Sequence, residues 1–241
     1  MDFFRKTYKE CCKRQFGPQG FKNANLTFWR VVNDVVQSFY IWCNRAGNRC
    51  FLNFGITPLA TGEGAGGLFP ATAFPQIANF WWDFNKTSEQ SVQICVSEVM
   101  QFLQQYVIPY FQRGIDCGSA FIENQNLYKN LRERKTQNGD EDEKPHKVVG
   151  GFAEYCMALK TRNWEFAKLY LKDMRALSQE ATTSEEAKDI HYANMMSERV
   201  AVYSDWLAHI ERHDEEFIQQ FIEANERKSL EALGLVKPGR N

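Results

Sequence analysis

Tryptophan, tyrosine and arginine side chains carry most of the recognition chemistry in the N-terminal half of this chain. Such side chains dominate the energetics of many protein interfaces, because rings and planar cations bury much surface while losing few rotamers. The same rings would also pack a hydrophobic core, so both roles are open from the residues alone. The predicted binding residues are Trp29, Tyr40, Trp42, Arg45, Arg49, Trp81, Trp82 and Asp83.

Carboxylates are scarce where a pocket would form. Between residues 23 and 84 the only acids are Asp34, Glu63 and Asp83. Asp83 follows Trp82, and an apolar cleft around such a carboxyl would raise its pKa. Asp83 is therefore the best candidate for acid–base chemistry, the alternative being a strand-end carboxylate in solvent.

Histidine-based catalysis is excluded from the N-terminal part, because all four histidines lie at or after residue 146. His209 and His213 stand four residues apart, a spacing that suits one metal ion on a helix. However, Ile210 occupies the position where a zinc peptidase carries its glutamate. We predict exposed helix histidines, with no catalytic residue, no metal site and no cofactor.

Two further classes of ligand are disfavoured. The glycine-rich stretch at 62–67 lacks the Gly-Lys-Ser/Thr ending of a phosphate-binding loop, so it predicts a flexible loop. The formal net charge is −1 and the signs are mixed along the chain, which leaves no broad basic surface for a phosphate backbone. No nucleic-acid partner is expected.

The chain begins with charged residues instead of the apolar core of a signal peptide, and it has no long apolar run. These features predict a cytoplasmic protein without a membrane partner. The seven cysteines are then expected to be free thiols, although Cys43 and Cys50 flank a predicted hairpin loop and could face each other across it.

The elements that must position these residues belong to two parts of the chain that differ in composition. Residues 1–131 hold 24 of the 34 aromatic residues, whereas residues 132–241 hold 38 of the 59 charged ones, which predicts an α+β domain, a polar linker at 132–147 and a helical extension at 148–241. Apolar spacing predicts a helix at 2–15, strands at 26–32, 35–43, 50–56 and about 80–84, a helix at 88–113 interrupted near Pro109, and four helices after residue 148.

The strands are expected to form an antiparallel meander of three or four strands packed by helices. The strand at 35–43 carries large apolar side chains on both faces. Helices or a partner chain should therefore cover both of its sides.

Several short motifs follow one another along the chain in a characteristic order. They are Gly20-Phe21, Gln37-Ser38, the run from Phe51 to Ile56, Trp81-Trp82 and Pro109. With this order and spacing, residues 1–130 resemble the uncharacterised bacterial domain-of-unknown-function family 4304. The resemblance implies an α+β domain and supplies no activity, substrate or catalytic residue. The family pattern also has an arginine shortly before the double tryptophan, where this chain has Ala73 to Gln76.

No motif specifies a reaction. We therefore predict a bacterial, non-catalytic protein-interaction module, such as an inhibitor, an immunity-type protein or an adaptor, with a protein partner that the sequence does not identify. The alternative is a small-molecule-binding protein or enzyme. Its pocket would lie between sheet and helices, gated by the loop at 57–79, with Asp83 or Glu63 as the acid.

Overall fold

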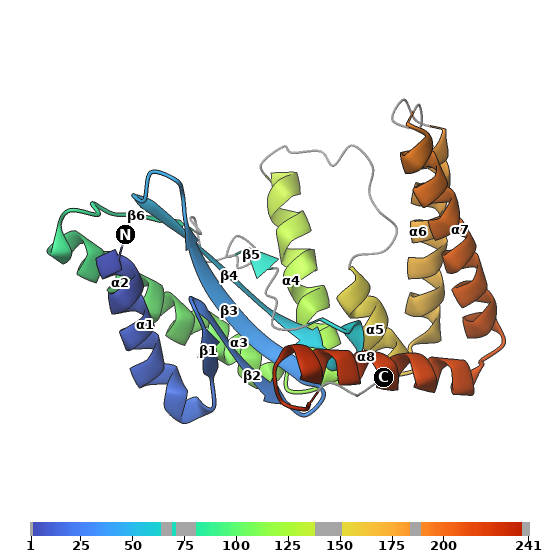
Figure 1. Ribbon diagram of the computed structural model, residues 1–241, viewed down its shortest axis with the longest axis horizontal. Helices are drawn as coiled ribbons and strands as arrows, with labels where there is room; N and C mark the ends of the chain where they lie inside the picture. Colours follow the sequence, from blue (N-terminus) through green and yellow to red (C-terminus); the bar gives the residue numbers. More distant parts are fainter. Residues whose placement is uncertain (1, 64–68, 71–80, 138–150, 184–188, 238–241) are drawn as a thin grey trace.

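The computed structural model describes residues 2–63, 69–70, 81–137, 151–183 and 189–237. Its sheet has six antiparallel strands: β1 to β4 pair in chain order, and β5 and β6 both pair with β4 (Figure 1). The strands are β1 (Lys22–Ala24), β2 (Thr27–Val32), β3 (Val35–Cys43), β4 (Arg49–Pro58), β5 (Phe69–Pro70) and β6 (Trp81–Asp83). The predicted α+β fold, its meander and the strand near residues 80–84 are confirmed, and the short strand β1 was not predicted.

The helices lie before and after the sheet in the chain. They are α1 (Asp2–Phe16), α2 (Glu89–Phe102), α3 (Ile108–Arg113), α4 (Cys117–Gln137), α5 (Phe152–Lys160), α6 (Trp164–Thr182), α7 (Ile190–Glu211) and α8 (Glu215–Ala232). A π-helical turn at Leu103–Val107 separates α2 from α3, and Pro109 stands in the first turn of α3, as the sequence predicted. The unpredicted helix α4 continues past residue 132, where the sequence indicated a linker.

The turn between β2 and β3 is tight, which fixes the register of the central strands. Asn33 occupies it with φ of 51°, a left-handed conformation that asparagine tolerates better than most residues. Val32 then pairs with Val35, and the pairing continues to Thr27 and Tyr40. This register decides which side chains share a face of the sheet.

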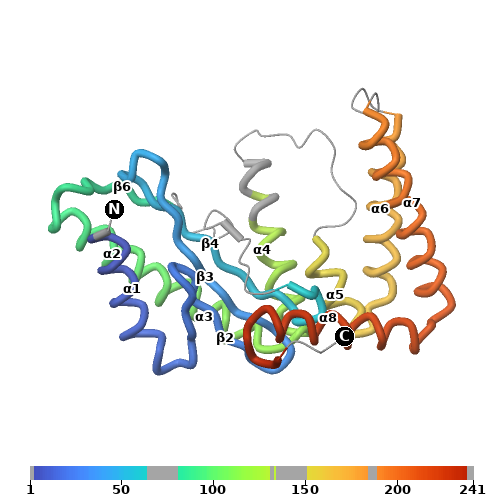
Figure 2. Tube along the Cα trace, in the orientation of Figure 1, coloured from blue at the N-terminus to red at the C-terminus, as the bar shows by residue number. Residues whose placement is uncertain are grey.

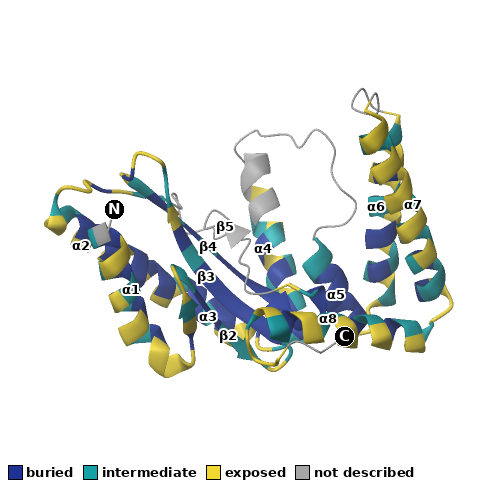
Figure 3. Cartoon of the chain, in the orientation of Figure 1, coloured by how far each residue is buried: buried dark blue, intermediate teal, exposed yellow. Residues whose placement is uncertain are grey.

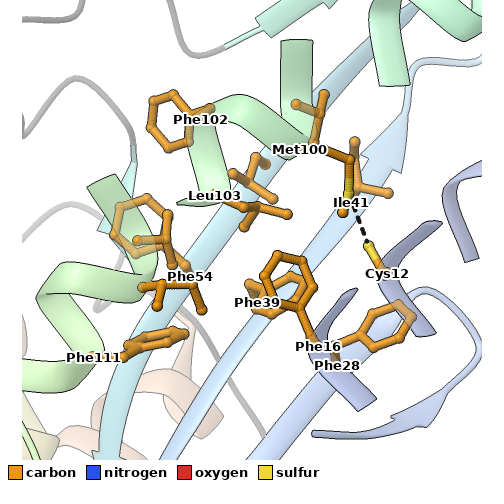
Figure 4. Packing of buried hydrophobic residues seen from close by; sticks show 14 of the residues in the cluster. Cys12, Phe16, Phe28, Phe39, Ile41, Phe54, Met100, Phe102, Leu103 and Phe111 are labelled. Carbon is orange, nitrogen blue, oxygen red and sulfur yellow. Dashed lines mark hydrogen bonds between the residues drawn. The ribbon is translucent and has the colours of Figure 1, made fainter. Parts of the chain in front are cut away.

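One face of the sheet packs against α1, α2 and α3. Phe39 lies at the centre of this main core, with its ring centroid 5.2 Å from that of Phe16 and 5.4 Å from those of Phe21 and Phe28 (Figure 4). Phe54 on β4 joins the same cluster. The main core therefore lies between the sheet and the helices that flank it in sequence.

Among the described residues, the opposite face has its buried cluster at one end. Trp29, Val36 and Leu59 form a small buried cluster, against which Leu230 and Leu233 pack from the C-terminal end of α8 and just beyond it. The predicted covering of β3 on both sides is thus confirmed near its start, where the residues of both faces are buried. Near its end Tyr40 is half-buried and Trp42 is 47 % exposed, so the described residues do not complete the cover there, and cover by a partner chain stays a prediction. Figure 3 colours the strands and helices by burial.

Helices α5 to α8 enclose a second core. Tyr155 lies at its centre, with ring centroids 5.1 Å from Tyr170 and 6.0 Å from Trp206. Helices α6 and α7 pair as an antiparallel hairpin whose far end projects from the molecule with mostly exposed side chains (Figures 1 and 3). The four helices predicted after residue 148 are confirmed.

Lys160 connects this helical part to the sheet. Its Nζ lies 3.0 Å from Asp34 Oδ2 in the β2–β3 turn and also contacts Glu226 on α8. Asp34 Oδ1 accepts a hydrogen bond of 3.0 Å from the backbone N–H of Cys117 at the start of α4. Burial alone would raise the pKa of Asp34, but the hydrogen bonds from Lys160 and Cys117 lower it below its ordinary value.

Replacing Lys160 by methionine is expected to lower the free energy of unfolding by about 1–2 kcal/mol at neutral pH, because two part-buried carboxylates lose their shared cation. Asp34 has its pKa lowered on folding, so its contribution is present above the unfolded value of 3.8 and is lost as the pH falls below it. Urea titrations at about pH 7 and pH 3 should therefore show the difference shrinking with acid. Lys172→Met, at an exposed pair on α6, is the matched control; an equal loss there would contradict the prediction.

Candidate functional site

Five residues come together at the end of the sheet that is formed by β3, β4 and β6 beside the β3–β4 loop; Figure 1 shows these strands. The register places Trp42 opposite Phe51, Phe51 opposite Trp81, and Arg49 opposite Asp83. Directly opposed residues in antiparallel strands share a face, so all five project from the side away from the main core. We call Trp42, Arg49, Phe51, Trp81 and Asp83 the aromatic platform.

The platform is held together by rings and one ion pair. The rings of Trp42 and Phe51 stack with centroids 4.2 Å apart and an interplanar angle of 12°. Arg49 donates to both carboxylate oxygens of Asp83, at 2.6 and 3.0 Å, while its guanidinium carbon lies 5.3 Å from the Trp81 ring centroid. A bidentate pair and a cation–π contact of this kind fix the orientation of exposed side chains.

Of the two interpretations of Asp83, the raised pKa in an apolar cleft does not hold. Its side chain is 60 % exposed and paired with Arg49, and the hydrogen bonds from that guanidinium lower the pKa of the carboxyl. Asp83 therefore remains ionised and cannot serve as a proton donor near neutral pH. The alternative interpretation, a strand-end carboxylate in solvent, is what the structure shows.

Four other predicted binding residues lie outside the platform. Tyr40 shares a face of β3 with Trp42 and is half-buried. Trp29 is only 8 % exposed and belongs to the cluster under α8, with Lys22 Nζ 5.5 Å from its ring centroid. Trp82 faces the main core, where its ring lies 5.5 Å from that of Phe102. These two tryptophans are packing residues, because strand alternation sends Trp81 and Trp82 to opposite faces. Arg45 is exposed in the β3–β4 loop.

A basic groove borders the same end of the sheet. Arg5, Lys6 and Lys9 on α1 face the β1–β2 turn at Asn25–Thr27 across a groove of about 670 Å³. None of these three cations forms an ion pair with another described residue. Burial raises the pKa of the Cys43 thiol to about 11, with the Arg5 charge acting in the opposite direction, which places Arg5 near the strand end that carries Trp42.

A second candidate site is a cavity of about 180 Å³ beside the edge of β4. Gly55 and Thr57 line it from the strand, Glu63 from the segment after β4, Tyr128 from α4, and Glu154 from α5. In the tube trace of Figure 2, α5 lies beside α4, and both helices contact β4. We call this space the β4–α5 cavity.

Glu154 is the buried acid of this cavity, and it is not among the residues predicted from the sequence. Only 2 % of the residue is exposed; its Oε1 accepts from Asn124 Nδ2 at 2.7 Å, and its Oε2 accepts from the Gly151 N–H at 2.7 Å. Asn124 Oδ1 in turn accepts from the Tyr110 hydroxyl at 2.6 Å. Burial raises the pKa of Glu154, partly offset by these hydrogen bonds.

The histidine pair does not form a common site. His209 Nδ1 lies 2.8 Å from Asp214 Oδ2 and its ring stacks on Phe217, whereas His213 packs edge-on against Trp164. Within the described ranges, no group of three or more potential ligands is close enough to hold a metal ion. Those same ranges contain no helix with the length and apolarity that crossing a bilayer requires.

No family model, curated protein or solved structure matches this chain. The resemblance of residues 1–130 to the uncharacterised bacterial family therefore stays a prediction. Three features of the described residues bear on function: the platform, the basic groove and the β4–α5 cavity.

Proposed function

We propose that the protein is a non-catalytic interaction module that binds an acidic protein partner through the aromatic platform and the basic groove. The observation that carries this proposal is the grouping of Trp42, Phe51 and Trp81 on one face of the sheet, with Trp42 47 % exposed. Tryptophan and arginine side chains clustered at the centre of a surface are typical of interface hot spots. An inhibitor, an immunity-type protein or an adaptor would use such a surface without any catalytic group.

The acidic character of the partner follows from charge. Arg49 is already paired with Asp83, so the platform itself is close to neutral. Arg45 is exposed in the adjacent β3–β4 loop, and Arg5, Lys6 and Lys9 add three cations at the groove between α1 and the β1–β2 turn, at the same end of the sheet. A suitable partner would place carboxylates against these cations and an apolar patch over Trp42, and so would contact both the groove and the platform. The charges would mainly accelerate association.

The test begins with the tagged protein in the bacterium that encodes it, followed by affinity purification and native mass spectrometry. Trp42→Ala is expected to weaken binding of the captured partner by at least about 30-fold while changing the free energy of unfolding by less than about 1 kcal/mol. Ile190→Ala, which truncates a side chain 66 % exposed on α7, is the control and should bind normally. A partner held equally well by the Trp42 variant would refute the platform as the interface.

Lys6→Glu separates the contribution of the groove. Charge reversal should slow association several-fold and reduce its salt dependence, with little change in dissociation. A single-stranded nucleic acid captured instead of a protein would contradict the proposal, because rings beside cations also suit stacked bases.

We also assign this activity to the cytoplasm of a bacterium. Support comes from the seven cysteines, all of which are free thiols. Cys43 and Cys50 are directly opposed in register, yet the Cys50 sulfur contacts that of Cys95, at 3.6 Å. Free thiols in such proximity suit a reducing compartment.

A second candidate function is small-molecule binding in the β4–α5 cavity, the alternative that the sequence left open. The observation that favours it is Glu154, an acid that is only 2 % exposed, at the wall of a cavity between sheet and helices. Glu63 borders this cavity as the sequence predicted, whereas Asp83 does not. The predicted gate at 57–79 lies partly outside the described residues.

A further inference from the structure

The β4–α5 cavity combines a small volume with a one-sided charge. Its 180 Å³ corresponds to roughly six water molecules, so it suits a compact organic ligand. Glu154 is enclosed in its wall and Glu63 is exposed at its rim. The described residues that line it include no lysine, arginine or histidine.

Among the described residues, Glu154 has no cationic partner. Both hydrogen bonds that the structure gives its carboxyl come from neutral donors, the Asn124 amide and the Gly151 N–H. Elsewhere in this protein, part-buried carboxylates such as Asp34 and Glu226 share a lysine. A carboxyl buried without a counter-charge is costly, and a cation that enters beside it lowers that cost.

The remaining walls also suit a cation. The aromatic side chains of Tyr128 and Phe152 line the cavity, and ring faces attract ammonium and guanidinium groups.

We propose that the β4–α5 cavity binds a small organic cation, a primary ammonium or guanidinium compound, with Glu154 as the buried counter-ion and Glu63 as a second carboxylate at the rim. This inference rests on the second candidate function, because it names the ligand class of the same cavity. Two carboxylates repel an anionic ligand, and a neutral ligand leaves the buried charge uncompensated. The cationic head group is therefore what selects the ligand.

The experiment compares ligands of similar size and different charge on the full chain. The probes are butylamine and butylguanidine as cations, pentan-1-ol as the neutral analogue and pentanoate as the anion, each titrated to about 10 mM. Amide resonances of Gly55, Thr57 and Gly151 report binding in the cavity, and calorimetry gives the affinity. We expect both cations to bind at least about tenfold more tightly than the other two.

Variants assign the effect to the two acids. Glu154→Gln should weaken cation binding at least about tenfold, and Glu63→Gln should weaken it several-fold. Because Glu154 also supports Asn124 and the start of α5, the exposed Glu63 provides a test that does not depend on the fold of the first variant. Glu198→Gln, an exposed acid on α7, is the matched control and should bind normally.

The outcomes separate this inference from the function on which it rests. Equal binding of pentan-1-ol or pentanoate at the same resonances would overturn the cation and leave small-molecule binding standing. If no probe moves these resonances, both the cationic ligand and the second candidate function are overturned. Cation binding that survives both glutamine variants would also refute the role of the two acids.

Discussion

Replacing Asn124 by leucine is expected to lower the free energy of unfolding by about 2–4 kcal/mol. Asn124 is fully buried and uses both ends of its amide, accepting from the Tyr110 hydroxyl and donating to Glu154. Leucine has the same number and branching of side-chain heavy atoms and is not smaller, so the loss comes from the polar groups left behind and not from a cavity. Each buried group that loses its partner costs about 1–3 kcal/mol.

The matched control is Asn126→Leu, the same substitution two residues along α4 at an exposed position. It should change the free energy of unfolding by less than about 0.5 kcal/mol. Chemical denaturation of both variants at neutral pH gives the comparison. Similar stabilities would mean that the Tyr110–Asn124–Glu154 chain of hydrogen bonds contributes nothing measurable.

Replacing Phe39 by alanine is expected to destabilise the protein by about 3–5 kcal/mol, the range for truncating a buried aromatic side chain. Its ring contacts those of Phe16, Phe21 and Phe28 in the main core and is completely buried. Thermal unfolding should show a clear fall in the midpoint, and urea titration should give the free energy directly.

Trp42→Ala on the same strand is the control, since it removes a larger ring from the opposite face. Its expected loss is below about 1 kcal/mol, because Trp42 contacts mainly Phe51 and is largely in solvent. The pair of variants thus measures the division of β3 into a packed face and an open one. Losses of equal size would show that the platform end of β3 is packed as tightly as the main core.

Much of the fold could be predicted because the central strands are dense in β-branched and aromatic residues. The strands β1 and β5 and the helix α4 were missed. β5 is only two residues long, at Phe69–Pro70. β1 is three residues long and includes Lys22 and Asn23, so its pairing with β2 leaves no apolar pattern in the sequence. In α4 the apolar residues are spread around the helix, with Ile122 60 % exposed and Leu127 buried, and its charged last turns resemble a linker.

The platform could be predicted only in part. Trp42, Arg49, Trp81 and Asp83 were singled out by residue type, but choosing between a core and a surface role needs the face of each strand. Pairing of Cys43 with Cys50 across the β3–β4 loop places Phe51 opposite Trp42, and this register was the available signal for Phe51. Glu154 gave a weaker signal, a capping-box spacing after Gly151, because its burial depends on Asn124 thirty positions earlier.

The contact between α8 and the sheet has a consequence for synthesis on the ribosome. The Ser229 hydroxyl lies 2.7 Å from the carbonyl oxygen of Leu59, across a separation of 170 residues. Because elements emerge in chain order, the sheet is complete long before α8 leaves the exit tunnel. During that interval the Trp29–Val36–Leu59 cluster lacks the cover of Leu230 and Leu233, so the nascent chain exposes an apolar surface that a chaperone can bind. A chain that is truncated before α8 keeps this surface exposed and is therefore prone to aggregation.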